Sequence, residues 1–421
     1  MQTGSPITML YVLLSTAVAV PAPAENWPCF RGPSRQGIST EQNMPVTWSS
    51  TRNVVWKTGV DGQGWSSPIV YGDLVFVTTA TEKGASFRLI ALDRATGSVK
   101  WNTEVFRQKT DYKMPQNSYA SATPVADGKR VYVLAADGSV AAVSMAGEKL
   151  WEYRDFQYYS QHGLGVSPVL HDGMIIVAFD WSSRGPDKTL GWQKPWDQSF
   201  ILALNAETGK ELWKARRGLS RIAHVTPQIV KTQQGMELVS SAGDVLQGFD
   251  LTTGDLLWTV RSSAEGLVPA VVAGGGLVYY TTGFGESLIR AVRPGGRGDV
   301  TATHLVWQTD KDVPHIPSML YAAPNLYTIT ENGVMQCLDA AAGKELWRHR
   351  FSGRFSASPV WARDRVYVLS ERGTMTVVAA SDTFSIIAEN EIGEKCCASP
   401  AISHGCIFIR TENSLYCIAN P

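Results

Sequence analysis

The stretch ALNAETGKELW, from Ala203 to Trp213, contains the sequence unit that decides the fold of this 421-residue chain. It consists of the end of an apolar strand, an Asn turn residue, a Thr-Gly pair and a second strand that ends in Trp. Similar units run from Ala91 to Trp101, from Phe249 to Trp258 and from Leu338 to Trp347. Asn, Asp and Gly favour tight turns because they tolerate backbone conformations that other residues avoid. Each unit therefore predicts a hairpin between two β-strands.

The tryptophan that ends the unit recurs along nearly the whole chain. Counting degenerate copies, it stands at Trp56, Trp101, Trp151, Trp213, Trp258, Trp307 and Trp347, with gaps of 45, 50, 62, 45, 49 and 40 residues. A repeat of this length is one supersecondary unit, which buries its faces only by packing on its neighbours. We interpret the rings as wedges between adjacent units, beside the repeat glycine, and not as stacking platforms for a ligand.

A Ser-Pro or Thr-Pro pair marks the start of an alternating strand in most units. The pairs begin at Ser67, Thr123, Ser167, Thr226, Ser358 and Ser399, and altered copies occur at Val268-Pro269 and Ser318-Met319. Segments such as 130–134 alternate with period two, and hairpin dipeptides such as Asn332-Gly333 follow at the right distance. Each unit is therefore predicted to be a four-stranded meander.

The number of strands predicts a closed ring. Eight inner strands follow the markers, but the last unit stops after residues 417–419 without an outer strand. Residues 53–57 supply that strand from the other end of the chain, which leaves no open edge. We expect an all-β, eight-bladed β-propeller of four-stranded antiparallel blades over residues 53–421, closed by an N-terminal strand in the last blade.

The first residues predict export. The apolar run from Met9 to Val20 is too short to span a bilayer, and small residues at Ala22 and Ala24 suit a signal peptidase. We expect a signal peptide at 1–24 with cleavage after Ala24, and an N-terminal extension at 25–52. The mature chain would be periplasmic or secreted, without a transmembrane segment. A retained membrane anchor is the alternative, because no Lys or Arg precedes the apolar run.

Charge and cysteine content exclude several classes of function. Thirty-eight basic residues balance 38 acidic ones, so no net field favours binding to nucleic acid or to an anionic membrane. Six cysteines are too few for a disulfide scaffold and are not spaced as zinc ligands. We therefore expect no nucleic-acid partner and no metal site, and the pairing of the cysteines stays open.

The Asp-x-x-Thr-Gly-x-x-x-Trp units and the Ser-Pro strand starts resemble the pyrroloquinoline-quinone (PQQ) type repeat. Quinoprotein alcohol dehydrogenases and the propeller lipoprotein of the outer-membrane assembly machinery share this repeat, so the resemblance implies the fold and leaves the activity open. Residues 26–33, 65–68 and 313–318 are also similar to exported PQQ-like propellers of planctomycete-type bacteria. The resemblance covers roughly residues 26–419.

Resemblance to the dehydrogenases would imply a quinone near a calcium ion bound by Glu, Asn and Asp, beside two adjacent half-cystines. The pair Cys396-Cys397 invites this comparison, but it precedes the Ser399-Pro400 marker of the last blade. No set of calcium ligands matches by position. We therefore assign no catalytic and no calcium-binding residue.

The strand order of a propeller brings two sets of loops to one rim. The connections between blades and the hairpins between second and third strands both open on the face where the inner strands begin. We call this the loop-bearing face. The candidate ligand-binding residues in its connections are Tyr119, His162, Arg221, His224, His315 and Arg354. His and Arg side chains suit an anion or a carboxylate, and a metal bound by the three histidines is a minor alternative.

A long insertion separates the predicted strands at 175–179 and 199–203. It carries Trp181, Trp192 and Trp196 off the repeat spacing, so the wedge explanation does not apply to them. Long loops in compact domains are usually functional or disordered. We expect a binding loop that overhangs the loop-bearing face, with a packed plug over the propeller as the alternative.

The repeat is complete and carries no recognisable reactive constellation. We therefore expect an exported, non-catalytic platform that binds a protein, a carbohydrate or a small molecule, with no cofactor. The alternative is a PQQ-dependent alcohol or sugar dehydrogenase, which would need PQQ and calcium. Whether the chain is an enzyme stays open on the sequence alone.

Overall fold

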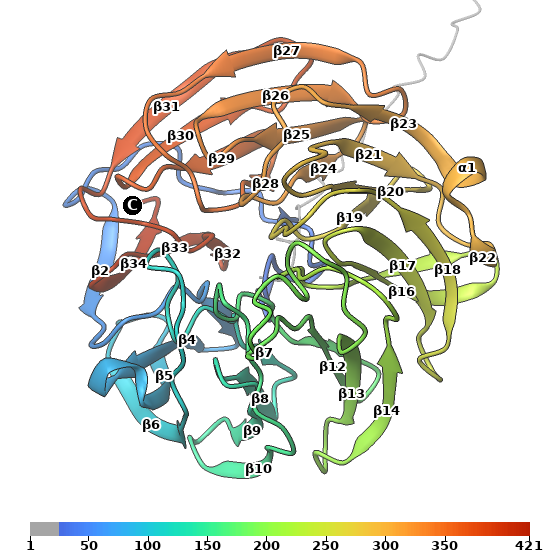
Figure 1. Cartoon of the computed structure of the whole chain (residues 1–421). Coiled ribbons are helices and arrows are strands. Elements are labelled where there is room, and N and C mark those ends of the chain that lie inside the picture. Colours follow the sequence, from blue (N-terminus) through green and yellow to red (C-terminus); the bar gives the residue numbers. More distant parts are fainter. Residues whose placement is uncertain (1–24) are drawn as a thin grey trace, which may run out of the picture.

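Residues 25–421, which the computed structural model describes, form eight antiparallel sheets around a central axis (Figure 1). Each sheet has four antiparallel strands, and two sheets gain a short fifth strand that pairs in parallel. The described residues contain one 3-10 turn, Glu82–Gly84, and one short helix, α1 (Thr301–His304). The predicted all-β, eight-bladed propeller is confirmed. The predicted signal peptide at 1–24 lies outside the described residues.

The blades follow one another along the chain, each running from its inner to its outer strand. Blade 1 contains β3 (Ile69–Tyr71), β4 (Leu74–Thr81), β5 (Ser86–Asp93) and β6 (Val99–Arg107). Blade 2 contains β7 (Val125–Ala126), β8 (Arg130–Leu134), β9 (Val140–Ser144) and β10 (Lys149–Tyr153). Blade 3 contains β11 (Val169–His171), β12 (Met174–Phe179), β13 (Phe200–Asn205) and β14 (Glu211–Arg216). Blade 4 contains β15 (Gln228–Thr232), β16 (Gly235–Ser241), β17 (Val245–Asp250) and β18 (Leu256–Arg261), with β22 (Gly298–Asp299) on its outer edge.

The second half of the ring repeats this arrangement. Blade 5 contains β19 (Val272–Gly274), β20 (Leu277–Thr281), β21 (Ile289–Val292) and β23 (Leu305–Thr309). Blade 6 contains β24 (Leu320–Ala322), β25 (Asn325–Ile329), β26 (Val334–Asp339) and β27 (Glu345–Arg350). Blade 7 contains β28 (Val360–Ala362), β29 (Arg365–Leu369), β30 (Thr374–Ala379) and β31 (Ile386–Glu391), with β1 (Ile38–Ser39) beside β28. Blade 8 contains β32 (Ala401–Ser403), β33 (Cys406–Arg410), β34 (Ser414–Ala419) and β2 (Val54–Gly59).

Blade 8 closes the ring with strands from both ends of the described chain. The N-terminal strand β2 pairs antiparallel with β34, and Trp56 lies opposite Cys417. Figure 1 shows β2, in blue, beside the red strands β33 and β34. The predicted closure by an N-terminal outer strand is confirmed. This pairing gives β34 a partner on an edge that would otherwise be free to bind another chain.

Most of the repeat tryptophans join one blade to the next. The indole Nε1 of Trp56 donates to the Arg94 carbonyl of blade 1 at 2.8 Å, and Trp151 donates to the Ala206 carbonyl of blade 3 at 3.0 Å. A Cβ atom built on Gly209 would lie 2.6 Å from the Trp151 ring, so only glycine leaves room for the indole. The interpretation of these rings as wedges between blades is confirmed for six of the seven. Trp258 instead donates to the Glu237 carboxylate of its own blade at 2.7 Å.

The Ser/Thr-Pro markers form a belt of hydrogen bonds around the central axis, at six of the eight blade junctions. The amide of Ser67 donates to the Thr123 hydroxyl of the next blade at 2.9 Å, and the amide of Thr123 donates to Ser167 at 3.0 Å. The same bond links Ser167 to Thr226, Ala270 to Ser318, Ser318 to Ser358, and Ser358 to Ser399. Sequence analysis identified the marker as a strand start but missed its role in joining blades.

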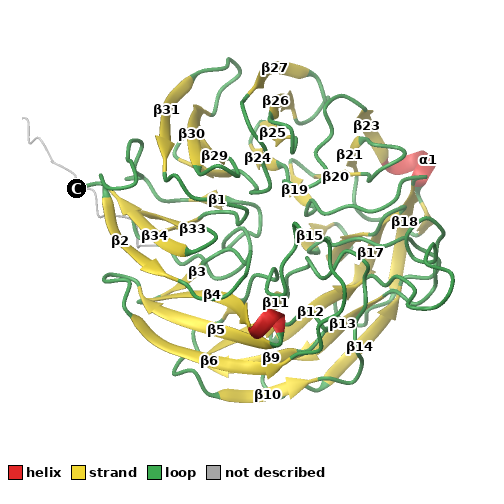
Figure 2. Ribbon diagram, turned by 60° about the vertical axis from the view of Figure 1, so that its left-hand side comes forward, coloured by secondary structure: helices red, strands yellow, loops and turns green. Residues whose placement is uncertain are grey.

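The N-terminal extension lies inside the ring. Trp27 pairs through its backbone with Val70 of β3, and the Arg31 guanidinium donates to the Met319 carbonyl before β24 at 2.6 Å. Strand β1 then pairs in parallel with β28, and Figure 2 shows β1 near the middle of the ring. Asn26 accepts from the Gly72 amide in the β3–β4 turn, on the face opposite the loop-bearing face. The extension therefore contacts the inner strands of blades 1, 6 and 7, with Asn26 at the opposite face.

Blade 7 lacks the repeat tryptophan, and the extension compensates for it. Ala388 lies opposite Val377 of β30, where the other outer strands carry Trp. Trp48 packs in the same apolar cluster as Ala388, and its amide donates to the Asn390 side chain at 2.7 Å. Across residues 25–421, no helix is long and apolar enough to cross a membrane.

Candidate functional site on the loop-bearing face

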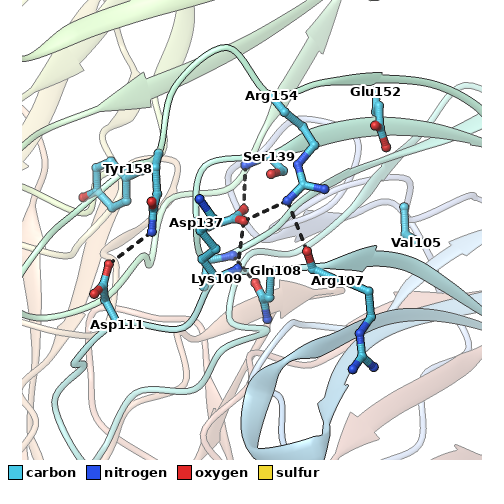
Figure 3. A network of polar contacts seen from close by, with 12 residues as sticks. Val105, Arg107, Gln108, Lys109, Asp111, Asp137, Ser139, Glu152, Arg154 and Tyr158 are labelled. Carbon is cyan, nitrogen blue, oxygen red and sulfur yellow. Dashed lines mark hydrogen bonds and ion pairs between the residues drawn. The ribbon is translucent and has the colours of Figure 1, made fainter.

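The two predicted loop sets meet on one face. Asp137, in the β8–β9 hairpin, accepts from the Lys109 amide of the preceding connection at 3.1 Å and from the Ser139 amide at 3.0 Å (Figure 3). Arg154 approaches the same carboxylate at 3.4 Å and also donates to the Arg107 carbonyl. Because Asp137 is only 4% exposed, this network fixes the connection that leads to Tyr119.

Tyr119 lines a small pocket between blades 2 and 3. Its hydroxyl donates to the Asp111 carbonyl at 2.7 Å, and Lys113 lies over its ring. Tyr158 and Tyr159 line the other side of this cavity of about 20 Å³. A space of that size has room for a water molecule.

The long insertion begins at a buried ion pair. Asp180 and Arg217 lie 2.6 Å apart with almost no exposure to solvent. Burial raises the pKa of Asp180 to about 6, although Arg217 opposes this shift. Further along the insertion, Arg184 pairs with Asp111 of the connection between β6 and β7. The insertion is therefore tied to blades 2 and 4 and lies over the loop-bearing face.

The three tryptophans of the insertion have different environments. Trp181 packs among Phe156, Tyr158 and Phe200, so its ring belongs largely to the core of blade 3. Trp196 is half-buried and pairs through its backbone with Ser220. Trp192 contacts the ring of His162, with the ring centroids 5.8 Å apart. Of the three, Trp192 is the one that meets a predicted site residue.

His162 and His224 form an imidazole pair beside Trp192. Their ring centroids lie 5.8 Å apart at an interplanar angle of 87°. Burial lowers the pKa of His162, and burial together with repulsion from His162 lowers the pKa of His224 to about 3. No hydrogen-bond partner for Nε2 of His224 occurs within residues 25–421. Both rings are therefore held neutral at pH 7.

Arg221 reaches toward blade 5 instead of joining the imidazole pair. Its guanidinium donates to the carbonyls of Ser263 and Ala264 at 2.9 and 3.0 Å, and its amide donates to Asp244 at 2.8 Å. Arg354 is exposed, and its carbonyl accepts from the Glu371 amide. The six connection residues therefore do not converge on one pocket.

His315 is the centre of a separate polar cluster between blades 5 and 6. Its Nδ1 lies 3.1 Å from Glu331 Oε1, and its Nε2 lies 2.9 Å from the Ser287 hydroxyl. Phe284 stacks on the imidazole, with centroids 4.5 Å apart and planes 9° apart. Burial raises the pKa of Glu331, but hydrogen bonds from His315 outweigh it and the net pKa lies below its ordinary value.

Ser287 and Glu331 were missed by the sequence analysis. Ser287 lies near the end of the loop between β20 and β21, and Glu331 begins the Glu-Asn-Gly turn between β25 and β26. Their loops open on the same face as the connection that carries His315. The strand order alone would have predicted that Glu331 lies near His315. The position of Ser287 depends on the conformation of its loop, which the strand order does not predict.

Cys396 and Cys397 are not joined to each other, so the half-cystine pair of the dehydrogenase resemblance is not formed among residues 25–421. Within residues 25–421, no group of three or more His, Cys, Asp or Glu side chains gathers to hold a metal ion. His315 is separate from the pair formed by His162 and His224. The three histidines therefore do not come together to bind one metal ion. Cys396 and Cys397 are free thiols, and burial raises the pKa of Cys397 to about 12.

The amino-acid sequence is similar to known proteins over most of the repeats. The sequence matches the family model described as outer membrane protein assembly factor BamB over residues 35–154, 87–185, 197–304 and 296–383. The BamB protein of Burkholderia pseudomallei (strain K96243) is 24% identical over 340 residues, which cover 80% of this chain and 66% of that protein. The matched region thus spans just under two thirds of that relative.

Solved structures share the fold at low identity. BamB from Moraxella catarrhalis superposes with a TM-score of 0.60 at 11% identity, covering 87% of this chain and 99% of that one. The quinohemoprotein alcohol dehydrogenase of Comamonas testosteroni gives a TM-score of 0.63 at 11% identity, covering 96% of this chain and 82% of that one. Likeness at this level shows the fold and not the activity. Because the family model matches most of the sequence across successive blades, the chain belongs to the PQQ_2 repeat-propeller family, whose model is described as the assembly factor BamB.

Proposed function

We propose that this chain is an exported propeller that binds a protein partner on its loop-bearing face. The observation that carries the proposal is the insertion from 180 to 198, which is fixed at its base by a buried ion pair. Arg184 on this insertion is exposed, and Trp192 is half-buried. Tryptophan and arginine are enriched among the contact residues of protein interfaces.

Two further points support this function. The B. pseudomallei relative is described as an outer membrane protein assembly factor, which names a protein-assembly role for a related propeller. Export rests on the predicted signal peptide at 1–24 and its cleavage after Ala24. The dehydrogenase alternative is less favoured, because no set of calcium ligands matches by position in the sequence and Cys396 and Cys397 are free thiols.

Site-specific photo-crosslinking in living cells tests the proposal. A photoreactive residue in place of Trp192 is expected to cross-link to a protein of the outer-membrane assembly machinery. The matched control replaces Lys129, an exposed residue in the β7–β8 turn on the opposite face. Equal products from both positions, or products from position 129 alone, would contradict the assignment of the binding face. The mass of the mature chain tests export separately.

Titration with the quinone tests the alternative. With calcium and pyrroloquinoline quinone added to the mature chain, we expect no saturable change in tryptophan fluorescence and no dye-linked alcohol oxidation. Saturable binding with turnover would overturn the choice between the two functions.

A further inference from the structure

The polar cluster around His315 has the connectivity of an acyl-transfer centre. Its three side chains come from three loops: Ser287 from the β20–β21 loop, His315 from the connection into blade 6, and Glu331 from the β25–β26 turn. Both ring nitrogens of His315 lie within hydrogen-bond reach of their partners, at 2.9 and 3.1 Å. A nucleophile, a base and a group that orients the base define such a centre by geometry, whatever their order along the chain.

We propose that Ser287, His315 and Glu331 form a hydrolytic triad on the loop-bearing face, with Ser287 as nucleophile toward carboxylic esters. This inference goes beyond binding of a protein partner. It also departs from the expectation of a non-catalytic platform, which rested on the lack of a recognisable reactive constellation in the sequence.

The charge of Glu331 fixes the protonation of His315. Glu331 is ionised at pH 7 because its pKa lies below its ordinary value. An ionised carboxylate only accepts hydrogen bonds, so Nδ1 of His315 must carry the proton. In the neutral ring, Nε2 then has a free lone pair directed at the Ser287 hydroxyl. That hydroxyl also lies 3.1 Å from the Gly283 carbonyl, which is its acceptor whenever the imidazole is protonated.

The loop that carries the nucleophile is held on both sides. Phe284 and Glu265 exchange two backbone hydrogen bonds at 2.7 and 2.8 Å. The Leu288 amide donates to the Thr282 hydroxyl, which in turn donates to the Glu286 carbonyl. The Glu286 carboxylate accepts from the Ser263 amide at 2.6 Å. These hydrogen bonds keep the loop, and with it Ser287, in a fixed position relative to its partners.

His315 and Glu331 are held in the same manner. The His315 amide donates to Glu331 Oε2 at 3.3 Å, so the carboxylate contacts both the ring and the backbone of the base. The Glu331 carbonyl accepts from the Phe355 amide of the next connection at 3.0 Å. Stacking of Phe284 on the imidazole restricts rotation of the ring.

The proposed reaction is hydrolysis of an ester in two steps. Ser287 Oγ attacks the carbonyl carbon while His315 Nε2 takes its proton, and the imidazolium then protonates the departing alkoxide as the C–O bond breaks. Water adds to the acyl-enzyme after giving a proton to His315, and the serine leaves with that proton as the carboxylic acid is released. Each cycle consumes one ester and one water and restores the chain.

The surroundings favour a small ester with an apolar acyl group. Phe284 is 56% exposed beside the imidazole, and Val268, in the connection that carries Glu265, is 37% exposed. The amides of Gly285, Glu286 and Ser287 donate no hydrogen bond to any of residues 25–421. These amides are the donors available to the negative charge that develops on the carbonyl oxygen.

Covalent labelling of the full chain tests the nucleophile. A fluorophosphonate probe is expected to label the folded protein once, with the adduct mapping to Ser287 by peptide mass. The variant Ser287→Ala should lose the label, whereas Ser263→Ala, a matched exposed serine on the neighbouring connection, should keep it. Absence of labelling in the wild-type chain, or labelling that survives Ser287→Ala, would overturn the proposal.

Steady-state hydrolysis of 4-nitrophenyl acetate tests the base and its positioning residue. Ser287→Ala and His315→Asn are expected to lower kcat by about 10³-fold or more with unchanged thermal midpoints. Glu331→Gln should lower kcat. It should also shift the rise of the rate with pH to lower pH, because the protonated His315 ring is no longer stabilised by the Glu331 carboxylate. If Glu331 had only a structural role, the pH–rate profile of Glu331→Gln would match that of the wild-type chain. This result would contradict the triad.

Discussion

Replacing Gly209 by alanine is the sharpest test of how the blades are joined. Gly209 has a φ of +71°, and an added Cβ would lie 2.6 Å from the Trp151 ring of the preceding blade. The substitution therefore carries two costs. A left-handed backbone costs a non-glycine residue about 1–2 kcal/mol, and forcing a methyl group into a packed contact costs about 1–3 kcal/mol more.

Gly173 separates these two costs. It has a φ of +75°, but no atom lies within 4 Å of the position that its Cβ would occupy. Gly173→Ala should therefore cost only the backbone term, and Gly209→Ala should be less stable than it by about 1–3 kcal/mol. Urea unfolding followed by tryptophan fluorescence measures the difference. Equal unfolding midpoints for the two variants would refute the idea that the indole needs the glycine.

Three further substitutions test the belt, the ion pair and the imidazole pair. Thr123→Val removes the acceptor of the buried Ser67 amide and should cost about 1–3 kcal/mol in urea unfolding; no loss would show that the belt is not stabilising. Asp180→Asn leaves the buried Arg217 charge with only the neutral partners Ser240 and Gln247, and should cost about 3–5 kcal/mol at pH 7. The pKa of Asp180 in the folded chain is raised to about 6, so the wild-type carboxyl favours folding most at low pH and loses this contribution as pH rises from about 4 to 6. In the variant, the free energy of unfolding should lack this decrease between pH 4 and 6. His224→Gln should make stability less sensitive to acid. Because the pKa of His224 is lowered to about 3, the folded state binds fewer protons than the unfolded state from about pH 6.5 down to 3. Thermal melts across this range would contradict us if the midpoint changed equally with pH in the wild-type chain and in the variant.

The ring was predictable because its residues recur. The repeat glycines and tryptophans define one contact between neighbouring blades, and the position of Trp56 upstream of the first marker revealed the strand that closes blade 8. The same strand order predicted that connections and hairpins share one face.

Contacts outside the repeat could not be derived in this way. The Arg31 guanidinium meets a carbonyl 288 residues away, and nothing in the spacing of the sequence indicates that the extension enters the ring. Trp181 and Trp192 lie on the same insertion, yet one packs in the core and the other on His162. This difference depends on the path of the loop. The contact between Ser287 and His315 likewise follows from a loop conformation and not from a pattern.

A cross-strand disulfide measures the closure of the ring most directly. Gly59 lies opposite Ser414 in the pairing of β2 with β34, and directly opposed residues have a separation that a disulfide can bridge. In the variant Gly59→Cys with Ser414→Cys, peptide mapping after mild oxidation should find the 59–414 bond in most molecules. The control Gly59→Cys with Leu415→Cys places the second thiol on the other face of β34 and should not form it. Absence of the 59–414 bond, or equal yields from the two pairs, would contradict an eight-bladed ring closed by its N-terminal strand.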